Sequence, residues 1–426
     1  MHIIYSLIGI LVSYTSRLCA LGAGATWPGE IALRLNPGIL EQLSHRLKKG
    51  AIVIAGTNGK TTTALLLKKM IESHGDSVVH NMTGANLLNG IVSTLLLSSK
   101  KDWGIFEVDE NVLPILLKYI HPTAIILLNL FRDQLDRYGE VDAIAEHWKK
   151  VLLALDSQSV VIANADDPLI CAVCENLKTK KIFFGLENPS LFRKTMQHAT
   201  DTIYCPKCGT RLTYGGVYYS HLGKWSCGSC SFTHPDVTLS MIDYQSSLEG
   251  VYNHYNAIAA SAVSKLIGIN EAHIRESLAD FVPAFGRMEH MTVWGKDVCI
   301  VLSKNPTGFN ESLETYINSK NKGPVLLLLN DRIPDGTDVS WIWDVDFELL
   351  NRNQNEIIVS GDRTYDMAIR IKYAIDDILR MTVSDKLESA LSIALSNVQI
   401  DETLWILATY SAMLDVRKIL TGKKIL

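Results

Sequence analysis

The sequence predicts an α/β protein with a central parallel-sheet domain, a four-cysteine insertion within it, and a smaller C-terminal α/β domain. Three observations predict this fold class. Short apolar β-type runs alternate with polar or acidic loops and helical stretches, which is the order of a parallel sheet with helical crossovers. One run, residues 52–55, ends in a glycine-flanked loop that opens a helix. Two C-x2-C pairs, separated by eighteen residues, stand near the middle of the chain.

Length and composition are those of a globular protein of roughly two to three domains. The 426 residues are 47% hydrophobic and 20% charged, with a formal net charge of −4. This mild acidity gives no reason to expect a nucleic-acid partner. Four of the eight cysteines form the two close pairs, so a disulfide framework is not indicated and a reducing, cytoplasmic location fits better.

An apolar run near the N-terminus, residues 3–12, is only about ten residues long. A membrane-spanning helix needs about 20 residues. A signal peptide would carry positive charge before the apolar run, whereas Arg17 comes after it. We therefore expect a buried helix or a helix that skims a membrane surface.

The loop after residues 52–55 has the composition of a phosphate-binding loop. Its glycines allow a tight turn that brings backbone N–H groups close to an anion, and the following helix adds the positive end of its dipole. Lys60 is expected to reach the outer phosphates and Thr61 to place a hydroxyl on a magnesium ion. The longer motif has a further glycine where this chain has Ile54, and the structural alternative is a plain turn. The predicted nucleotide-binding residues are Gly56, Thr57, Asn58, Gly59, Lys60, Thr61 and Thr62.

Acidic residues follow a neighbouring predicted strand, residues 103–108, and the first of them is Glu107. The carboxyl ends of strands are where a doubly wound sheet places its ligand chemistry. Glu107 is therefore the candidate magnesium partner of Thr61, the alternative being a solvated acidic turn. Further strands are predicted at residues 124–128 and 160–163, and helices at residues 39–48, 64–70 and 167–177.

The two C-x2-C pairs form the pattern C-x2-C-x18-C-x2-C, which is typical of a zinc site. Four thiolates close the coordination sphere, so the site is expected to be structural rather than catalytic. The residues between the pairs predict a small β-ribbon whose core is too small to fold without its metal. Cys171 and Cys174 lie in a predicted helix and are interpreted as small core residues. The predicted zinc ligands are Cys205, Cys208, Cys227 and Cys230.

A later helix, predicted from Gly250 to Ile267, carries two asparagines three residues apart, Asn253 and Asn256. They share a helical face, which suits recognition of a purine edge or a ribose; the alternative is that they cap the helix. Arg287 follows in a hinge-like segment. It can meet a phosphate or simply pair with Glu289.

A second α/β unit begins near residue 290, with strands predicted at residues 298–302, 325–329, 356–360 and 404–409. One loop of this unit, residues 331–346, combines five carboxylates with two tryptophans. This composition favours a site or an interface over a plain surface. The carboxylates are Asp331, Asp335, Asp338, Asp344 and Asp346.

On these residues the chain resembles the Mur ligase family over nearly its whole length. Residues 56–62 look like that family's ATP loop, and Glu107 sits like its magnesium carboxylate. Asn253 and Asn256 look like its adenine-side amides, and Arg287 looks like its hinge arginine.

The likeness is closer to the ligase subunits of lipid II isoglutaminyl synthases. It rests on the four-cysteine insertion and on residues 129–140 and 335–344. Two features depart from the amino-acid-adding Mur ligases. Residues 133–136 read Asp-Gln-Leu-Asp instead of Asp-His-Leu-Asp, and only about 50 residues precede the ATP loop, too few for a UDP-binding domain. Both indicate a substrate other than a soluble UDP-sugar nucleotide.

The resemblance implies that ATP phosphorylates the α-carboxylate of D-glutamate in the stem peptide of lipid II. Ammonia then gives D-isoglutamine, a step of peptidoglycan synthesis. It implies ATP, Mg²⁺ and structural Zn²⁺ as cofactors, and a GatD-like glutamine amidotransferase as partner in a heterodimer. It further implies a cytoplasmic protein that works at the inner face of the membrane, where lipid II lies.

The resemblance also implies that an aspartate of the C-terminal domain orients the partner's catalytic histidine. Asp338 is the first choice and Asp344 the second, with Asp335 still open. The expected domains are residues 1–289, with the insertion at about 201–236, and residues 290–426.

Two other interpretations stay open. A stand-alone Mur-type or folylpolyglutamate-type ligase would join an amino acid to a carboxylate without a glutaminase. A non-catalytic nucleotide-binding scaffold would use its ribbon to recruit partners, although the combination of Lys60, Thr61 and Glu107 argues against it.

Overall fold

The structure is a computed structural model that describes residues 26–81, 85–133, 141–241, 244, 248–282 and 287–422, the side chain of Arg287 excepted. The apolar run at residues 3–12 lies outside these ranges, as do Gln134, Leu135 and Asp136. Within the described ranges, no helix has the length and apolar character needed to cross a membrane.

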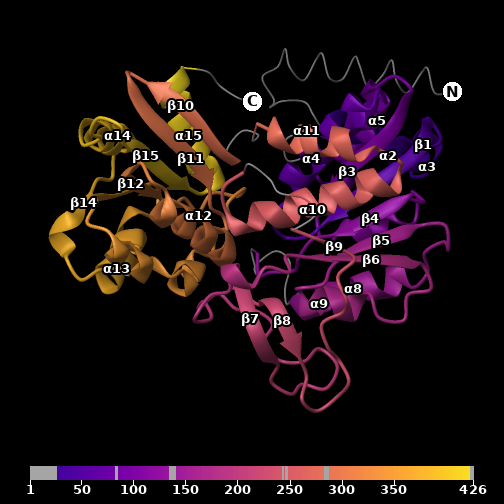
Figure 1. The fold of residues 1–426 in the computed structure, drawn as a ribbon. Coiled ribbons are helices and arrows are strands. Elements are labelled where there is room, and N and C mark those ends of the chain that lie inside the picture. Colours follow the sequence, from indigo (N-terminus) through magenta and orange to yellow (C-terminus); the bar gives the residue numbers. More distant parts are fainter. Residues whose placement is uncertain are drawn as a thin grey trace.

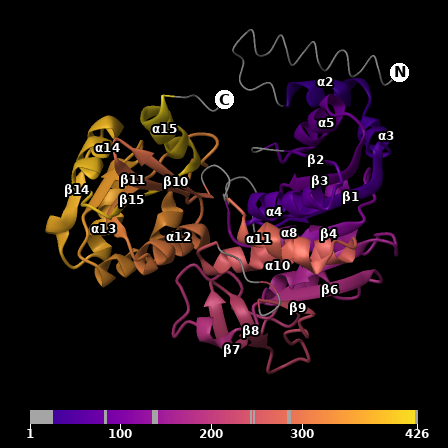
Figure 2. The same cartoon turned by 45° about the horizontal axis from the view of Figure 1, so that its top comes forward.

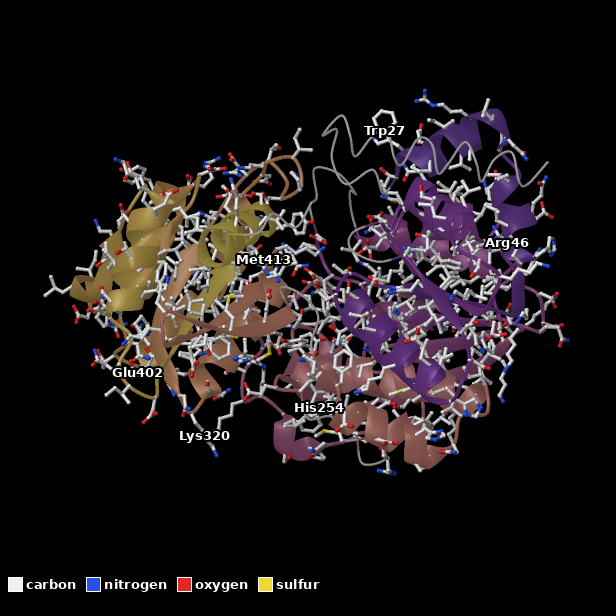
Figure 3. The ribbon with its side chains drawn as sticks, turned by 90° about the horizontal axis from the view of Figure 1, so that it is seen from above. Trp27, Arg46, His254, Lys320, Glu402 and Met413 are labelled. Atoms are coloured by element: carbon white, nitrogen blue, oxygen red, sulfur yellow. The ribbon has the colours of Figure 1, made fainter. Side chains whose placement is uncertain are left out.

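The chain folds into two bodies that lie side by side, with a small ribbon projecting from the first (Figures 1 and 2). Figure 3 shows the side chains of both bodies from above, with Arg46 in the first body and Met413 in the second. Each body is built on its own sheet, and the ribbon forms a third, two-stranded sheet. The predicted fold class is confirmed.

The sheet of the first body is wholly parallel and has the strand order β2-β3-β1-β4-β5-β6-β9. The apolar run that predicts β1, an inner strand of this sheet, is uninterrupted because both faces of the strand are covered. Ile52 and Ile54 pack into one core, and Val53 and Ala55 pack into the core on the opposite face. The strands are β1 (Leu47–Ala55), β2 (Val78–His80), β3 (Lys101–Val108), β4 (Ala124–Leu127), β5 (Val160–Asn164), β6 (Lys180–Gly185) and β9 (Leu239–Ser240).

Helices cover both faces of this sheet. The face with Ile52 is covered by α4 (Lys60–Ser73), α10 (Val251–Leu266) and α11 (Glu271–Ala279). The other face is covered by α2 (Trp27–Leu35), α3 (Ile39–Ser44), α5 (Leu88–Leu97), α6 (Leu113–Leu116), α8 (Val141–Leu152) and α9 (Pro168–Val173).

The second body has a mixed sheet of order β10-β11-β15-β12-β13-β14, in which only the β10–β11 pair is antiparallel. Its strands are β10 (Arg287–Val293), β11 (Lys296–Leu302), β12 (Lys322–Leu328), β13 (Ile357–Ser360), β14 (Met381–Val383) and β15 (Thr403–Ala408). Its helices are α12 (Pro306–Asn318), α13 (Thr364–Ala374), α14 (Leu387–Ser396) and α15 (Tyr410–Thr421). Short 3-10 turns are η1 (Pro189–Leu191), before the ribbon, and η2 (Ser340–Asp344), η3 (Phe347–Arg352) and η4 (Ile378–Arg380) in this body.

The ribbon consists of β7 (Thr213–Tyr219) and β8 (Leu222–Ser226), which pair antiparallel. It stands at the lower end of the first body in Figure 1. Its core includes Trp225, which stacks against Phe232 with ring centroids 4.6 Å apart.

Two predicted helices are longer than the observed ones. The helix predicted at residues 39–48 ends at Ser44, because Leu47 already pairs with Lys101 of β3. The helix predicted at residues 167–177 ends at Val173, with Cys174 as its cap.

Candidate functional site

The phosphate loop joins β1 to α4, as its sequence predicts. Gly56 and Gly59 have positive φ angles of 147° and 91°, which side chains disfavour. A Cβ at Gly59 would also lie 2.1 Å from Oδ1 of Asn256, so any other residue here would have to displace the side chain of Asn256. The N–H groups of Thr57 and Asn58 already donate to Asn129, so the N–H groups suited to an anion are those in the first turn of α4.

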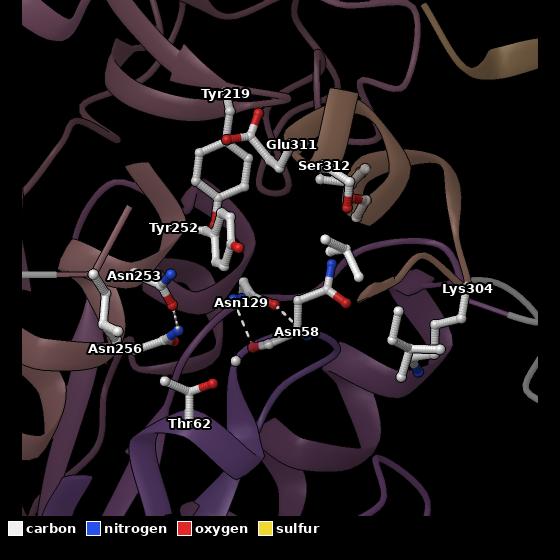
Figure 4. Close-up of a pocket in the computed structure, with 16 residues that line it drawn as sticks. Asn58, Thr62, Asn129, Tyr219, Tyr252, Asn253, Asn256, Lys304, Glu311 and Ser312 are labelled. Carbon is white, nitrogen blue, oxygen red and sulfur yellow. Dashed lines mark hydrogen bonds between the residues drawn. The ribbon is translucent and has the colours of Figure 1, made fainter. Parts of the chain in front are cut away.

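The segment after β4 holds the loop from the other side. The backbone N–H of Asn58 donates to Oδ1 of Asn129 at 2.9 Å, and Nδ2 of Asn129 donates to the carbonyl of Asn58 at 3.1 Å (Figure 4). The hydroxyl of Thr57 accepts from the backbone N–H of Phe131 at 3.0 Å. These bonds fix the loop before any nucleotide arrives.

Thr61 and Glu107, predicted as a magnesium pair, are in contact. The hydroxyl of Thr61 donates to Oε2 of Glu107 at 2.8 Å. The other carboxylate oxygen lies 2.8 Å from Nε2 of His80, at the end of β2. A hydroxyl and a carboxylate at this spacing are the hard oxygen ligands that Mg²⁺ prefers, so the residues fit this ion.

Lys60 curls back onto its own loop, where its ammonium donates to the carbonyls of Gly56 and Thr57. It also lies 3.8 Å from Oε1 of Glu110. Burial raises the pKa of Glu110, while Lys60 and Lys304 oppose that rise. In the described structure Oε1 of Glu110 has no hydrogen-bond partner, which leaves it as a buried acceptor beside Lys60.

The second body supplies a basic and an amide side chain to this site, both from the segment between β11 and α12. Lys304 pairs with Asp133. Nδ2 of Asn305 donates to Oδ1 of Asn58 at 3.1 Å, and Oδ1 of Asn305 accepts from the N–H of Gly308 at 2.7 Å. Asn305 thus caps α12 and touches the phosphate loop at once.

A pocket lies between the loop, α10, the end of β7 and the first turns of α12 (Figure 4). Asn253 and Asn256 both line it, as their shared helical face predicts. Nδ2 of Asn256 donates to Oδ1 of Asn253 at 3.2 Å, and Thr63 donates to Oδ1 of Asn256 at 3.3 Å. Each amide keeps a further N–H or lone pair for a ligand.

Of Arg287 only the backbone is described, as the first residue of β10. Its predicted partner Glu289 accepts a hydrogen bond from Nε of Arg417 at 2.9 Å. The role of Arg287 stays a prediction.

The four predicted zinc ligands come together in the ribbon. The Sγ atoms of Cys208 and Cys227 are 3.4 Å apart, those of Cys205 and Cys230 are 3.7 Å apart, and all four lie within 4.8 Å of one another. A tetrahedral zinc ion with Zn–S distances of about 2.3 Å holds its sulfurs about 3.8 Å apart, so the cluster fits this metal. Cys171 and Cys174 lie buried outside this cluster, as interpreted.

The three candidate aspartates of the C-terminal body differ in their burial and in the residues that their carboxylates contact. Asp335 is buried and accepts from the backbone N–H and hydroxyl of Ser411 at the start of α15. Asp344 pairs with Arg132 of the first body at 3.2 Å. Asp338 is exposed and accepts from the backbone N–H of Ser340 at 2.8 Å, and hydrogen bonds from the backbone and side chain of Ser340 lower the pKa of Asp338.

Sequence reasoning gave no role to Lys304, Asn305 and His80, although each follows or ends a parallel strand. The carboxyl end of β11 and that of β2 are the signal that could have found them.

Comparisons with known proteins match both bodies. Residues 54–264 match the family described as the Mur ligase middle domain, and residues 302–413 match the one described as MurT ligase C-terminal. The lipid II isoglutaminyl synthase (glutamine-hydrolyzing) subunit MurT of Staphylococcus aureus (strain COL) is 32% identical over 371 residues, covering 82% of this chain and 83% of that one. The corresponding subunit of Streptococcus pneumoniae is 32% identical over 447 residues, covering 98% and 97%.

A solved structure supports the fold. The crystal structure of the MurF ligase of Thermotoga maritima in complex with ADP superimposes with a TM-score of 0.63 at 15% identity, covering 90% of this chain and 81% of that one. At this identity the likeness concerns the fold alone.

Proposed function

This chain belongs to the Mur ligase family and, within it, to the MurT subunits of lipid II isoglutaminyl synthases, and from that premise we propose the reaction that its site carries out. The chain is the ATP-consuming ligase subunit that amidates the α-carboxylate of D-glutamate in lipid II, in peptidoglycan synthesis. The observation that carries the proposal is the convergence of Lys60, the Thr61–Glu107 pair and Lys304 on one phosphate loop.

The chemistry follows from the need to turn a carboxylate into an electrophile. A carboxylate oxygen attacks the terminal phosphorus of ATP, ADP leaves, and an acyl phosphate forms. Ammonia then attacks the carbonyl carbon, phosphate leaves, and the amide remains after loss of a proton. Thr61 and Glu107 would hold a magnesium ion, which would supply positive charge against the transferring phosphoryl group.

The residues of this chain supply orientation and charge. Lys60 leaves the carbonyls of its own loop and turns to the outer phosphates. Lys304, which Asp133 holds near the loop, adds a second positive charge from the other body. Preorganised charges of this kind supply a large part of phosphoryl-transfer catalysis. Asn253 and Asn256 hold the adenosine end of the nucleotide, and Arg287 stays a candidate for the phosphates.

The ammonia comes from glutamine, hydrolysed by a GatD-like amidotransferase that forms a heterodimer with this chain. Asp338 is the residue most available to this partner, because its carboxylate is exposed while Asp335 and Asp344 are engaged within the chain. A carboxylate that orients a histidine of a second protein must reach the surface. Because the proposed substrate is linked to a lipid, we place the protein in the cytoplasm, acting at the inner face of the membrane.

The proposal also includes a structural zinc ion in the ribbon. It places the domain boundary near residue 290 and the insertion at about residues 201–236. The four thiolates fill a tetrahedral shell and leave no position for substrate. The zinc ion is therefore assigned to folding of the ribbon rather than to the reaction.

Mass spectrometry of lipid II, incubated with the chain, its glutaminase partner, Mg-ATP and glutamine, tests this function. Amidation gives the small mass decrease of a hydroxyl replaced by an amine. A gain of an amino-acid mass would instead establish the stand-alone ligase, and binding of ATP without turnover would favour the scaffold.

A further inference from the structure

Glu311 is the one acidic side chain among the described residues that line the pocket of Figure 4. It belongs to α12 and is buried, with a relative exposure of 4%. A buried carboxylate facing a ligand pocket needs a partner, and the phosphates of a nucleotide cannot be that partner because they are negative.

Two residues that lead into the ribbon hold this carboxylate. Arg193 donates to Oε1 of Glu311 at 2.9 Å, and Gln197 donates to the same oxygen at 3.5 Å. Arg193 is itself fixed by a bond from its Nε to the carbonyl of Tyr218 at 2.7 Å. In the described part of the chain the recorded side-chain bonds end at Oε1, which leaves Oε2 for a ligand.

The position of Glu311 along α12 takes it away from the phosphate loop, within the same pocket. A Cβ on Gly308, in the first turn, would lie 3.9 Å from Nδ2 of Asn58, so that turn stands beside the phosphate loop. Glu311 comes three residues later, about 4.5 Å further along the helix axis. There it lies near Tyr219, on the far side of the pocket from Asn58 in Figure 4.

We propose that Glu311, held in place by Arg193, is the residue that selects adenine over guanine in this pocket. Adenine carries an amine donor at the position where guanine carries a carbonyl acceptor. The free carboxylate oxygen accepts from the amine, whereas it faces a second acceptor when guanine is bound. This inference rests on the proposed use of ATP.

Through the same contacts, the segment that leads into the ribbon and the ribbon's first strand form one wall of the ligase pocket. Arg193 and Gln197 precede β7, and Tyr219 ends it, so the ribbon's first strand and its approach form the wall that holds Glu311.

Equilibrium binding of non-hydrolysable ATP and GTP analogues to the full chain with its glutaminase partner, above neutral pH, tests the inference. Wild type is expected to prefer the ATP analogue, and Glu311→Gln to lose at least about tenfold of that preference, because its amide can pair with either base. Glu311→Asp keeps the negative charge, but its shorter side chain moves the carboxylate away from the pocket, so it is expected to lose part of the preference. Glu314→Gln is the matched control, since Glu314 binds Arg193 at 2.7 Å but does not line the pocket.

The outcomes separate this inference from the assignment of ATP itself. An unchanged preference in both Glu311 variants, or an equal loss in Glu314→Gln, overturns the role of Glu311 alone. Binding of neither analogue by wild type overturns both the inference and the proposed use of ATP.

Discussion

Asn305 and Asn58 exchange two amide hydrogen bonds across the boundary between the two bodies. Nδ2 of Asn305 donates to Oδ1 of Asn58 at 3.1 Å, and Nδ2 of Asn58 donates to Oδ1 of Asn305 at 3.4 Å. The predicted phosphate loop is thereby joined to the cap of α12, so these two bonds link the loop to the second body.

Asn305→Ala removes both functions of this side chain and is expected to lower the free energy of unfolding by about 1 kcal/mol through loss of the cap. Asn305→Asp keeps the cap acceptor but removes the donor to Asn58, so its unfolding free energy should stay near wild type. Urea unfolding measures both. Equal destabilisation by the two substitutions would mean that the contact with Asn58, and not the cap, provides the stability.

The stability of the folded chain should fall with pH through the titration of Glu311. Burial raises the pKa of Glu311 from 4.5 to about 7, against the opposing effect of Arg193. The folded chain therefore binds the proton more tightly than the unfolded chain, and this stabilisation is present below about 4.5 and lost as the pH rises through about 7. Arg193, Gln197, Glu314 and Tyr219 are the groups that face it.

Unfolding free energies measured on both sides of this window check the sign. Glu311→Gln does not titrate and should show a flatter dependence on pH, while Glu314→Gln removes a negative charge that raises the pKa of Glu311 and should keep the pH dependence but move it to lower pH. A slope in Glu311→Gln as steep as that of wild type would assign the effect to another group.

Removal of one zinc ligand should unfold the ribbon. Cys208→Ser leaves three thiolates, so the chain is expected to lose its zinc and the ribbon to become sensitive to protease, because its core depends on the metal. Cys174→Ala is the control, since Cys174 lies in the core of the first body. Metal analysis and limited proteolysis provide the readouts. Full zinc content in Cys208→Ser would contradict a four-thiolate site.

The exposed carboxylate of Asp338 should matter only when glutamine is the ammonia source. Asp338→Asn is expected to reduce glutamine-dependent amidation by about 10⁴-fold, as the corresponding change does in an acid–histidine pair. It should leave ammonia-dependent amidation near wild type. Asp344→Asn is the comparison that separates the two candidates. Loss of both activities in Asp338→Asn would place its role in the ligase reaction or in folding.

The sequence predicts features that depend on a short stretch of residues better than features that depend on contacts between distant residues. The phosphate loop and the four cysteines are short motifs, and the structure places them as predicted. Strand β2 is three residues long and lacks a long apolar run, so it was not predicted. The contacts of Asn305 with Asn58 and of Arg193 with Glu311 join residues 247 and 118 positions apart, which no local pattern reveals.

The most direct measurement is the mass of lipid II after incubation with Mg-ATP and ammonia, comparing wild type with Lys60→Ala, each bound to the glutaminase partner. Ammonia bypasses the glutaminase, so only the ligase chemistry of this chain is tested. We predict that wild type amidates lipid II, and that Lys60→Ala retains the partner but yields no amide. Amidation by Lys60→Ala at the wild-type rate would contradict the account, because the phosphate loop would then not carry the reaction.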